Sequence, residues 1–316
     1  MQYKIEFIRS NFNKDKLFLL PLLAKFRIMK QIKIGLWVVF LFATATLTTG
    51  LKHAVEYRSL GDLVEEGLLS VKVQGNGGHS GKCIKMTLHN QGMENVAVQI
   101  EAGRRLSSDN PNEQDILITK SERVKVNGKD STTLLVSGYC CQSSNSGPSK
   151  KSTFGIGNMA PSTWVTLAKF LDEHKFNSSS EQAAVWALSN DHPISSINSK
   201  SKWDVLPLRG LVAKIKNEPI PWYYVDYAKD TSVFSGKHSS LSGFIFYYVN
   251  ANSVVNIVVK TDKDQLVKVI SKGTGRGHGK QKDYIEIDVM HWKKGNYKVE
   301  VYQDMANLVA SQSFKL

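Results

Sequence analysis

Apolar residues recur at every second position in short runs along most of this 316-residue chain, and turn-forming residues separate the runs. Side chains of a β-strand alternate between the two faces of a sheet, so the pattern predicts strands that each bury one face. Asn127-Gly128 lies between two of the runs, which predicts a hairpin turn there. In the first half of the chain the runs are Leu69-Val71-Val73, Ile84-Met86-Leu88, Val96-Val98-Ile100, Ile116-Ile118, Val124-Val126 and Leu134-Val136.

The same spacing returns between Tyr223 and the end of the chain. Short strands at regular spacing, with turn signals between them, are typical of antiparallel sandwiches. We therefore expect a mainly β fold of two immunoglobulin-like β-sandwiches, the first carrying a helical hairpin. The predicted parts are a first sandwich with its hairpin at 60–195, a linker at 196–221 and a C-terminal immunoglobulin-like sandwich at 222–316.

Apolar residues at helical spacing predict the hairpin, with helices at 162–175 and 179–189. Pro161 is suited to the first turn of the first helix. Ser178 and Glu181 have the spacing of a capping box, so Ser178 is expected to cap the second helix. Two short helices cannot form a core alone, so their apolar faces must pack on the sandwich or on each other.

The first fifty residues carry eight Lys and Arg against two acidic residues, and a basic stretch there precedes an apolar run from Ile34 to Thr46. This arrangement is typical of a signal peptide over 1–50, with Met29 as the start and residues 1–28 as an upstream extension. The alternative is an uncleaved membrane anchor over 34–51, which is at the short end for spanning a bilayer. We expect a secreted, periplasmic or cell-surface protein.

The formal net charge is +13, and outside the first fifty residues 33 basic residues remain against 26 acidic ones. The excess is scattered in isolated pairs such as Lys150-Lys151 and Lys293-Lys294, without the clustering of a nucleic-acid surface. We expect no nucleic-acid partner, and contact with a membrane only through the N-terminal segment if it is uncleaved. The expected partner is an envelope or surface polymer or protein.

Three cysteines in an exported chain leave at least one thiol unpaired. Cys83 lies on an early predicted strand, and Cys140 and Cys141 lie at the end of the last strand of the first sandwich. A bridge from Cys83 to either neighbour would stabilise the fold by at most about 4 kcal/mol, because it closes a long loop. A bridge between the two adjacent cysteines is the other possible pairing, and the sequence does not choose between them.

Gln182-Ala183-Ala184-Val185-Trp186 resembles the Thr-Gln-x-Ala-Ile/Val-Trp signature of the thioester domains of bacterial surface adhesins, although Glu181 stands where that family has Thr. The resemblance implies that Gln182 supplies an acyl group to the sulfur of Cys140 or Cys141, and that a nucleophile of a partner attacks the bond. The alternative is that Gln182 is a polar residue of a packed helix and that Trp186 belongs to the core.

Gly295-Asn296-Tyr297-Lys298-Val299 resembles the closing strand of immunoglobulin-like C-terminal modules in exported Bacteroidetes proteins. The Pro-Asn-Pro opening of the version that directs secretion sorting is missing here. The resemblance implies a small immunoglobulin-like sandwich at the C-terminal end of the chain.

A nucleophilic enzyme site would need Cys140 or Cys141 beside His174 or His192, and nothing in the sequence brings them together. The eight histidines lack metal-ligand spacing. We therefore predict an exported, non-catalytic interaction or adhesion protein without a cofactor or metal. A thioester-bearing adhesin is the first alternative, and a hydrolase is the second.

Overall fold

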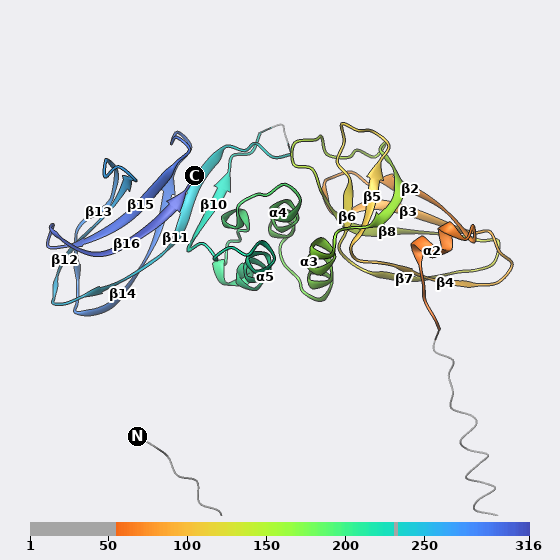
Figure 1. Ribbon diagram of the computed structural model, residues 1–316, viewed down its shortest axis with the longest axis horizontal. Coiled ribbons are helices and arrows are strands. Elements are labelled where there is room, and N and C mark those ends of the chain that lie inside the picture. Colours follow the sequence, from red (N-terminus) through yellow and green to blue (C-terminus); the bar gives the residue numbers. More distant parts are fainter. Residues whose placement is uncertain (1–54, 231–232) are drawn as a thin grey trace, which may run out of the picture. The chain divides into compact units, whose positions relative to one another are not determined.

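The computed structural model describes residues 55–230 and 233–316, and from Glu56 onward the chain forms one unit (Figure 1). The predicted signal or anchor segment, with Met29 and the apolar run over 34–51, lies outside the described residues. Within the described ranges, no helix is both long and apolar enough to cross a bilayer. The fold is mainly β, as predicted.

Six strands of the N-terminal region close into a barrel. Inward-facing apolar side chains form its core, and Cys83 and Cys140 are among them. In order of pairing the strands are β2 (Leu69–Gly75), β3 (Ser80–Asn90), β8 (Ser131–Cys140), β6 (Ile116–Ile118), β5 (Arg104–Ser108) and β9 (Thr153–Met159), and β9 pairs with β2 to close the circle.

This barrel replaces the first sandwich that we predicted, because two of its strands lack the alternating pattern. Leu106 is the one apolar residue of β5, and Gly155 and Gly157 interrupt β9. Both strands pair nevertheless, β5 with β6 and β9, and β9 with β2. These pairings join two edges that a sandwich would leave open, so the sheet closes on itself.

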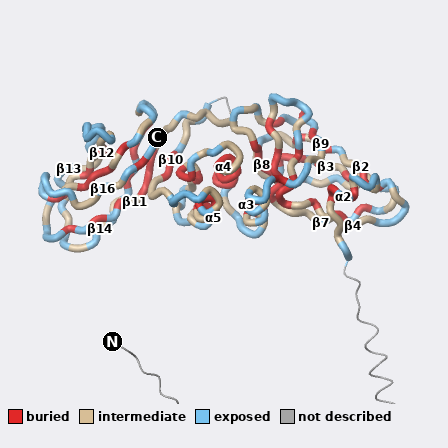
Figure 2. Tube along the Cα trace, viewed as in Figure 1, coloured by how far each residue is buried: buried red, intermediate tan, exposed pale blue. Residues whose placement is uncertain are grey.

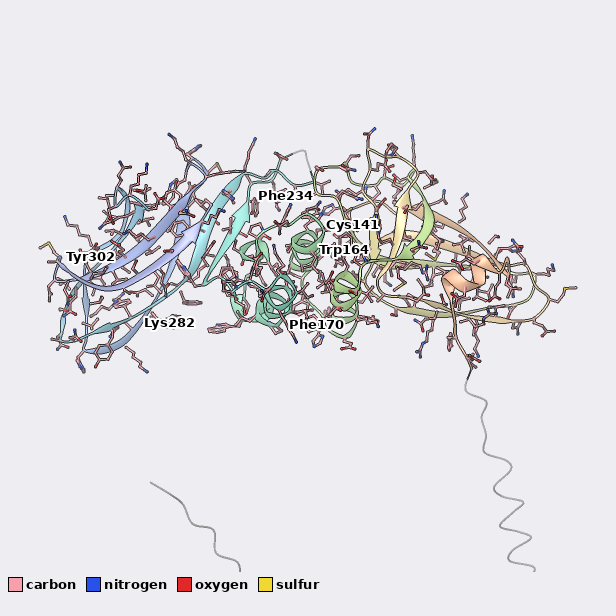
Figure 3. All side chains as sticks on the ribbon, viewed as in Figure 1. Cys141, Trp164, Phe170, Phe234, Lys282 and Tyr302 are labelled. Carbon is pink, nitrogen blue, oxygen red and sulfur yellow. The ribbon has the colours of Figure 1, made fainter. Side chains whose placement is uncertain are left out.

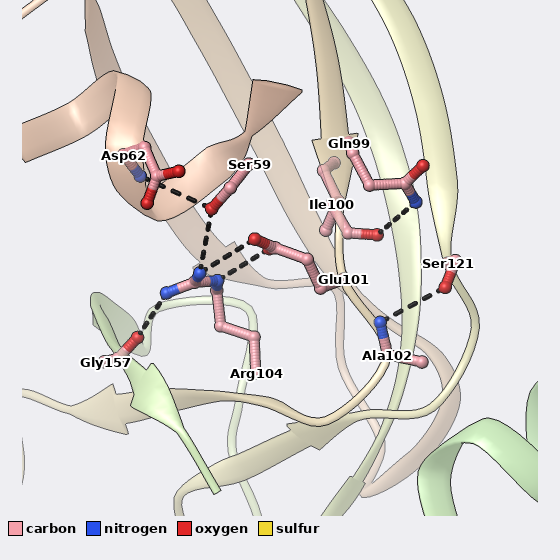
Figure 4. Close-up of polar contacts among 9 residues, drawn as sticks. All are labelled: Ser59, Asp62, Gln99, Ile100, Glu101, Ala102, Arg104, Ser121 and Gly157. Atoms are coloured by element: carbon pink, nitrogen blue, oxygen red, sulfur yellow. Dashed lines mark hydrogen bonds and ion pairs between the residues drawn. The ribbon is translucent and has the colours of Figure 1, made fainter. Parts of the chain in front are cut away.

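A small three-stranded sheet shares the barrel core. It contains β1 (Arg58–Ser59), β4 (Val96–Ile100) and β7 (Glu122–Val126), and α2 (Leu60–Glu65) follows β1 directly. Arg104, at the start of β5, links these elements to the barrel. Its guanidinium donates to the Glu101 carboxylate, the Gly157 carbonyl and the Ser59 hydroxyl (Figure 4).

The predicted helical hairpin is present as α3 (Ser162–Glu173) and α4 (Ser178–Ser189). A third helix, α5 (Leu206–Lys216), occupies the stretch at 196–221 that we predicted as a linker. Pro207 lies in its first turn, where proline favours a helix, so a proline-containing stretch forms a helix here and not the predicted linker. All three helices pack with Tyr139 and Cys141 in a second core, and α4 is largely buried (Figure 2).

Two sheets make up the C-terminal region. One consists of β10 (Tyr223–Tyr227), β11 (His238–Val249) and β14 (Gly279–Asp288), in that order of pairing. The other consists of β13 (Leu266–Arg276), β12 (Ser253–Thr261), β15 (Asn296–Gln303) and β16 (Asn307–Lys315). Both sheets contribute alternate side chains to one core, and the strands predicted here are present. The immunoglobulin-like character of this region remains a prediction.

Candidate functional site

The side chain of Gln182 lies against the main chain of Cys140, where the first turns of α4 meet the end of β8. The Cys140 N–H donates to Gln182 Oε1 at 3.2 Å, and Gln182 Nε2 donates to the Cys140 carbonyl at 2.8 Å. Gln182 is only 3% exposed, so its carboxamide is withdrawn from bulk water. The structure thus places Gln182 beside one of the two cysteines named for a thioester.

The end of the β3–β8 ladder explains why a carboxamide binds at this point. β3 begins at Ser80, which pairs with Tyr139 of β8. Cys140, the next residue of β8, therefore has no residue of β3 opposite it. The His79 carbonyl lies 3.3 Å from the Cys140 nitrogen and shares the same N–H. A carboxamide offers one acceptor and one donor side by side, as a neighbouring strand would, so Gln182 continues the ladder.

Glu181, one residue earlier on α4, binds the same strand. Its Oε2 accepts a hydrogen bond from the Tyr139 hydroxyl at 2.6 Å, and its Oε1 accepts one from the Phe176 N–H at 3.1 Å. Burial, reinforced by the hydrogen bond to Glu181, raises the pKa of Tyr139, so the phenol stays protonated as the donor. Sequence analysis did not single out Tyr139. Glu181 could have indicated this contact from the sequence. It stands where the adhesin thioester domains have Thr, and a carboxylate at that position implies a hydrogen-bond partner other than that of Thr.

The cap of α4 lies one residue before the predicted one. Asn177, not Ser178, is the N-cap, and its Oδ1 accepts from the Ser180 N–H at 2.8 Å. The prediction followed the Ser-x-x-Glu spacing, but asparagine is at least as good a cap as serine. Glu181 still reaches back to a main-chain N–H, although it is that of Phe176.

The three cysteines are buried free thiols that lie in two different cores. Cys83 and Cys140 belong to the barrel core, and Cys141 belongs to the helix core (Figure 3). Neighbouring side chains of a strand point to opposite faces, which separates Cys140 from Cys141. Cys140 is therefore the partner that shares a core with Cys83, and a Cys83–Cys141 bridge would have to cross the strand. The structure contains no disulfide among the described residues, so the Cys83 bridge remains a prediction.

Burial also sets the protonation state of these thiols. Desolvation raises the pKa of Cys83 to about 11 and that of Cys141 to about 12, and it raises the pKa of Cys140 as well. Because the thiolate is the nucleophile, all three thiols are protonated and weakly reactive at neutral pH. A bond between Cys140 and Gln182 would therefore depend on their proximity in the folded protein.

The histidines considered for an enzyme site lie elsewhere. His174 stacks on Phe170 at 4.1 Å between ring centroids, at the end of α3. His192 bonds to the Ser143 hydroxyl at 2.9 Å and packs on Trp186. Among the described residues, neither imidazole has a hydrogen bond or ring contact with a cysteine. The same part of the chain contains no group of three or more His, Cys, Asp or Glu side chains that could hold a metal ion.

No protein-family model matches this chain, and no curated protein is significantly similar to it. The resemblances to adhesin thioester domains and to immunoglobulin-like modules therefore rest on the short stretches quoted above.

Proposed function

We propose that this protein is an exported, non-catalytic interaction or adhesion protein of the cell surface or periplasm, and that it attaches covalently to its partner through an internal thioester between Gln182 and Cys140. The partner would be an envelope or surface polymer, or a protein, that presents a nucleophile. The C-terminal region would serve as the immunoglobulin-like spacer or interaction module.

The observation that carries the proposal is the pair of hydrogen bonds between the Gln182 carboxamide and the Cys140 main chain. They hold the carboxamide of Gln182 against the main chain of the residue that bears the thiol, and such proximity would favour the reaction. Cys141 shares the helix core with α4, whereas the Cys140 side chain belongs to the barrel core, so it is the contact with the Cys140 main chain that favours Cys140 for the sulfur.

The proposed bond forms when the Cys140 sulfur attacks the carboxamide carbon of Gln182. The carbon–nitrogen bond breaks, and the thiol proton leaves with the nitrogen as ammonia. A nucleophile of the partner then attacks the same carbon, the carbon–sulfur bond breaks, and the sulfur recovers a proton. Burial of Gln182 would protect the thioester from hydrolysis until a partner arrives.

Intact-mass spectrometry of the mature protein tests the proposal. A thioester lowers the mass by about 17 Da through loss of ammonia, and it hides one thiol from alkylation under denaturing conditions. Methylamine should add its own mass to Gln182 and expose that thiol. Gln182→Glu, which keeps the size and the oxygen that accepts from the Cys140 N–H, should abolish both signs.

Cys140→Ser and Cys141→Ser form a matched pair that identifies the sulfur. We expect the mass deficit to vanish in Cys140→Ser and to persist in Cys141→Ser. A deficit that vanishes only in Cys141→Ser would move the bond to Cys141. A wild-type mass without any deficit, and without a response to methylamine, would overturn the covalent proposal.

A passive, non-covalent interaction protein is the second candidate. It is favoured by the fact that both polar ends of the Gln182 carboxamide are already satisfied by Cys140, as in an ordinary buried contact. Retained binding to a surface polymer or protein in Gln182→Glu would support this candidate.

A further inference from the structure

A cavity of about 180 Å³ lies beside α4, where four segments of the described chain meet. By the share of about 30 Å³ that one water occupies in the liquid, it has room for roughly six waters or one small ring molecule. Residues that line it include Trp186 of α4, His192 and Asn198 after that helix, Asp226 and Tyr227 of β10, and Phe234 (Figure 3). They are separated by up to several dozen positions, so no local pattern indicates that they converge.

Aromatic rings form one wall of this cavity. Phe234 packs on His192 at 4.3 Å, on Tyr227 at 4.8 Å and on Trp186 at 5.5 Å between ring centroids. The ring planes are tilted by between 37° and 60°, so both faces and edges border the space. Such a wall suits a ligand that has an apolar face.

Two polar atoms of this wall lack a partner among the described residues, namely Trp186 Nε1 and His192 Nδ1. Trp186 is only 7% exposed, so its N–H is an unsatisfied buried donor. Desolvation, with Lys216 nearby, lowers the pKa of His192, so the imidazole is neutral at neutral pH. A buried donor without a partner favours a ligand that brings an acceptor oxygen.

The charges around the cavity limit the ligand further. Asp226 is the one formally charged residue among the described residues that line it, and its Oδ1 accepts from Asn198 Nδ2 at 2.7 Å. A carboxylate in the wall would repel an anionic ligand. A cation would satisfy Asp226 and the rings but would leave the Trp186 N–H without an acceptor. An uncharged ring with several hydroxyl groups satisfies donors and acceptors together.

We propose that this cavity binds a neutral pyranose, as the terminal sugar of a surface glycan. The apolar C–H face of the ring would pack on Phe234 and Trp186, and its hydroxyl groups would bond with Trp186 Nε1, Asp226 and Asn198. The inference goes beyond the proposed thioester, because sugar binding of this kind requires no covalent bond.

A wider polar groove continues from the cavity and would hold the next units of the glycan. Its volume is about 510 Å³, and it shares Ser179, Asn198 and Asp226 with the cavity. Lys200 and Lys202 also line this groove, and Lys202 Nζ donates to Asn198 Oδ1 at 2.7 Å, so a lysine reaches the boundary between the groove and the cavity. Trp186 is also one helical turn after Gln182, so a glycan bound here would lie close to the proposed acyl group.

Titration of the mature full chain with D-glucose, D-galactose, D-mannose and N-acetyl-D-glucosamine tests the inference, with saturation-transfer NMR and tryptophan fluorescence as readouts. We expect at least one sugar to bind with a dissociation constant on the order of 1 mM. Phe234→Ala should weaken that binding at least about tenfold, which corresponds to the loss of one well-packed ring. Trp203→Ala is the matched control, because Trp203 is an aromatic residue that is 59% exposed and does not line this cavity.

Three results would overturn the inference. The first is absence of binding by all four sugars at roughly tenfold higher concentration. The second is tighter binding of tetramethylammonium or acetate, and the third is equal loss of binding in Phe234→Ala and Trp203→Ala. Titration before and after methylamine treatment separates this inference from the thioester, because we expect the same sugar affinity in both samples.

Discussion

The barrel region and the C-terminal pair of sheets are both built from antiparallel strands, but they hold their charged side chains in different ways. In the barrel region, Arg104 and Glu101 form an ion pair at the place where β1, β5 and β9 meet. In the C-terminal region, Glu300 lies on the outer face of a sheet beneath two lysines. The contrast shows which parts of a β fold a sequence pattern can reveal.

The Arg104 site is a cross-link between elements (Figure 4). Two parallel hydrogen bonds, of 2.8 and 2.9 Å, join its guanidinium to the Glu101 carboxylate, and a third of 2.9 Å reaches the Gly157 carbonyl of β9. Burial acts to raise the pKa of Glu101, but the hydrogen bonds from Arg104 and Ser59 outweigh it and lower that pKa. Glu101 is therefore charged at neutral pH and depends on Arg104.

The Glu300 site is an ion-pair network on the outer face of a sheet, where the neighbouring side chains cover the carboxylate so that Glu300 is only 3% exposed. Lys260 and Lys298 lie 2.9 and 3.0 Å from its carboxylate oxygens, and the Tyr302 hydroxyl donates to it at 2.6 Å. Tyr302 lies on the C-terminal sheet in Figure 3. The strand that carries Glu300 has Tyr297, Val299 and Val301 on its buried face. The alternation of apolar residues defines this strand, whereas the charged side chains only cover its outer face.

The largest expected effect is that of Arg104→Ala on the barrel region. The change leaves the Glu101 carboxylate without its partner and removes the bond that holds β9. We expect a loss of about 3 kcal/mol in the free energy of unfolding, near the low end for a buried pair because Glu101 is partly exposed. Hydrogen–deuterium exchange should accelerate in β5 and β9 and remain unchanged in β12 and β15.

Arg58→Ala is the matched control for this prediction. Arg58 pairs with Glu66, and both side chains are well exposed. An exposed pair contributes little to stability, so the control should behave almost as wild type. Equal effects of the two variants, or faster exchange in the C-terminal strands of Arg104→Ala, would show that the Arg104 pair is not a local cross-link of the barrel.

The same contrast explains how much of the fold could be predicted. Strands whose inward positions are apolar, as in β11, β12 and β15 of the C-terminal region, follow from alternation alone. β5 and β9 could not be found in this way, because an arginine occupies an inward position of β5, and two glycines, which strands disfavour, alternate with the apolar Phe154 and Ile156 of β9. Their pairing depends on Arg104 and on tertiary contacts, which a local pattern does not contain.

The Asn127-Gly128 prediction failed for a related reason. The flanking strands β7 and β8 belong to different sheets, so the turn joins two sheets and not the strands of a hairpin. A side-chain carbon at Gly128 would lie 1.8 Å from the Met93 carbonyl oxygen. The glycine is therefore required by a close approach of the main chain, and this approach has no signature in the local sequence.

At the candidate site, the motif identified Gln182 and its helix, and the cysteine count identified the thiols. The choice between Cys140 and Cys141 depends on which face of β8 each side chain occupies, and this followed only from the structure. The cavity around Trp186 was beyond prediction as well, because β10 and Phe234 reach it through the fold.

A smaller effect is expected at Glu300. Desolvation acts to raise its pKa, but the hydrogen bonds from Tyr302, Lys260 and Lys298 outweigh this and lower it to about 2, from an ordinary value of 4.5. A depressed carboxyl pKa contributes stability above the ordinary pKa, and this contribution disappears as the pH falls toward the folded-state value. The C-terminal region of wild type should therefore lose stability between about pH 4.5 and pH 2.

Glu300→Gln measures that contribution by difference. The midpoint of thermal unfolding of the variant should be lower than that of wild type at pH 7, and the two should converge as the pH approaches 2. Added salt should narrow the gap at pH 7 only slightly, because the carboxylate is buried beneath the lysines and buried pairs are screened much less than exposed ones. Glu286→Gln, on the exposed face of β14, is the control. A constant gap from pH 7 to pH 2 would contradict the proposed origin of the effect.

The smallest effect concerns the cap of α4, the helix that holds Gln182 against the barrel region. Asn177→Ala removes the acceptor for the Ser180 N–H, and we expect a loss of about 1 kcal/mol. Ser178→Ala removes only an exposed hydrogen bond to Ser80 and should cost less, about 0.5 kcal/mol. Chemical denaturation with far-ultraviolet circular dichroism would measure both values. A larger loss in Ser178→Ala than in Asn177→Ala would restore the capping box that the sequence predicted. Asn177 would then not be the N-cap of α4. Because the first turn of α4 positions Gln182, the contact between Gln182 and Cys140 would also be in question.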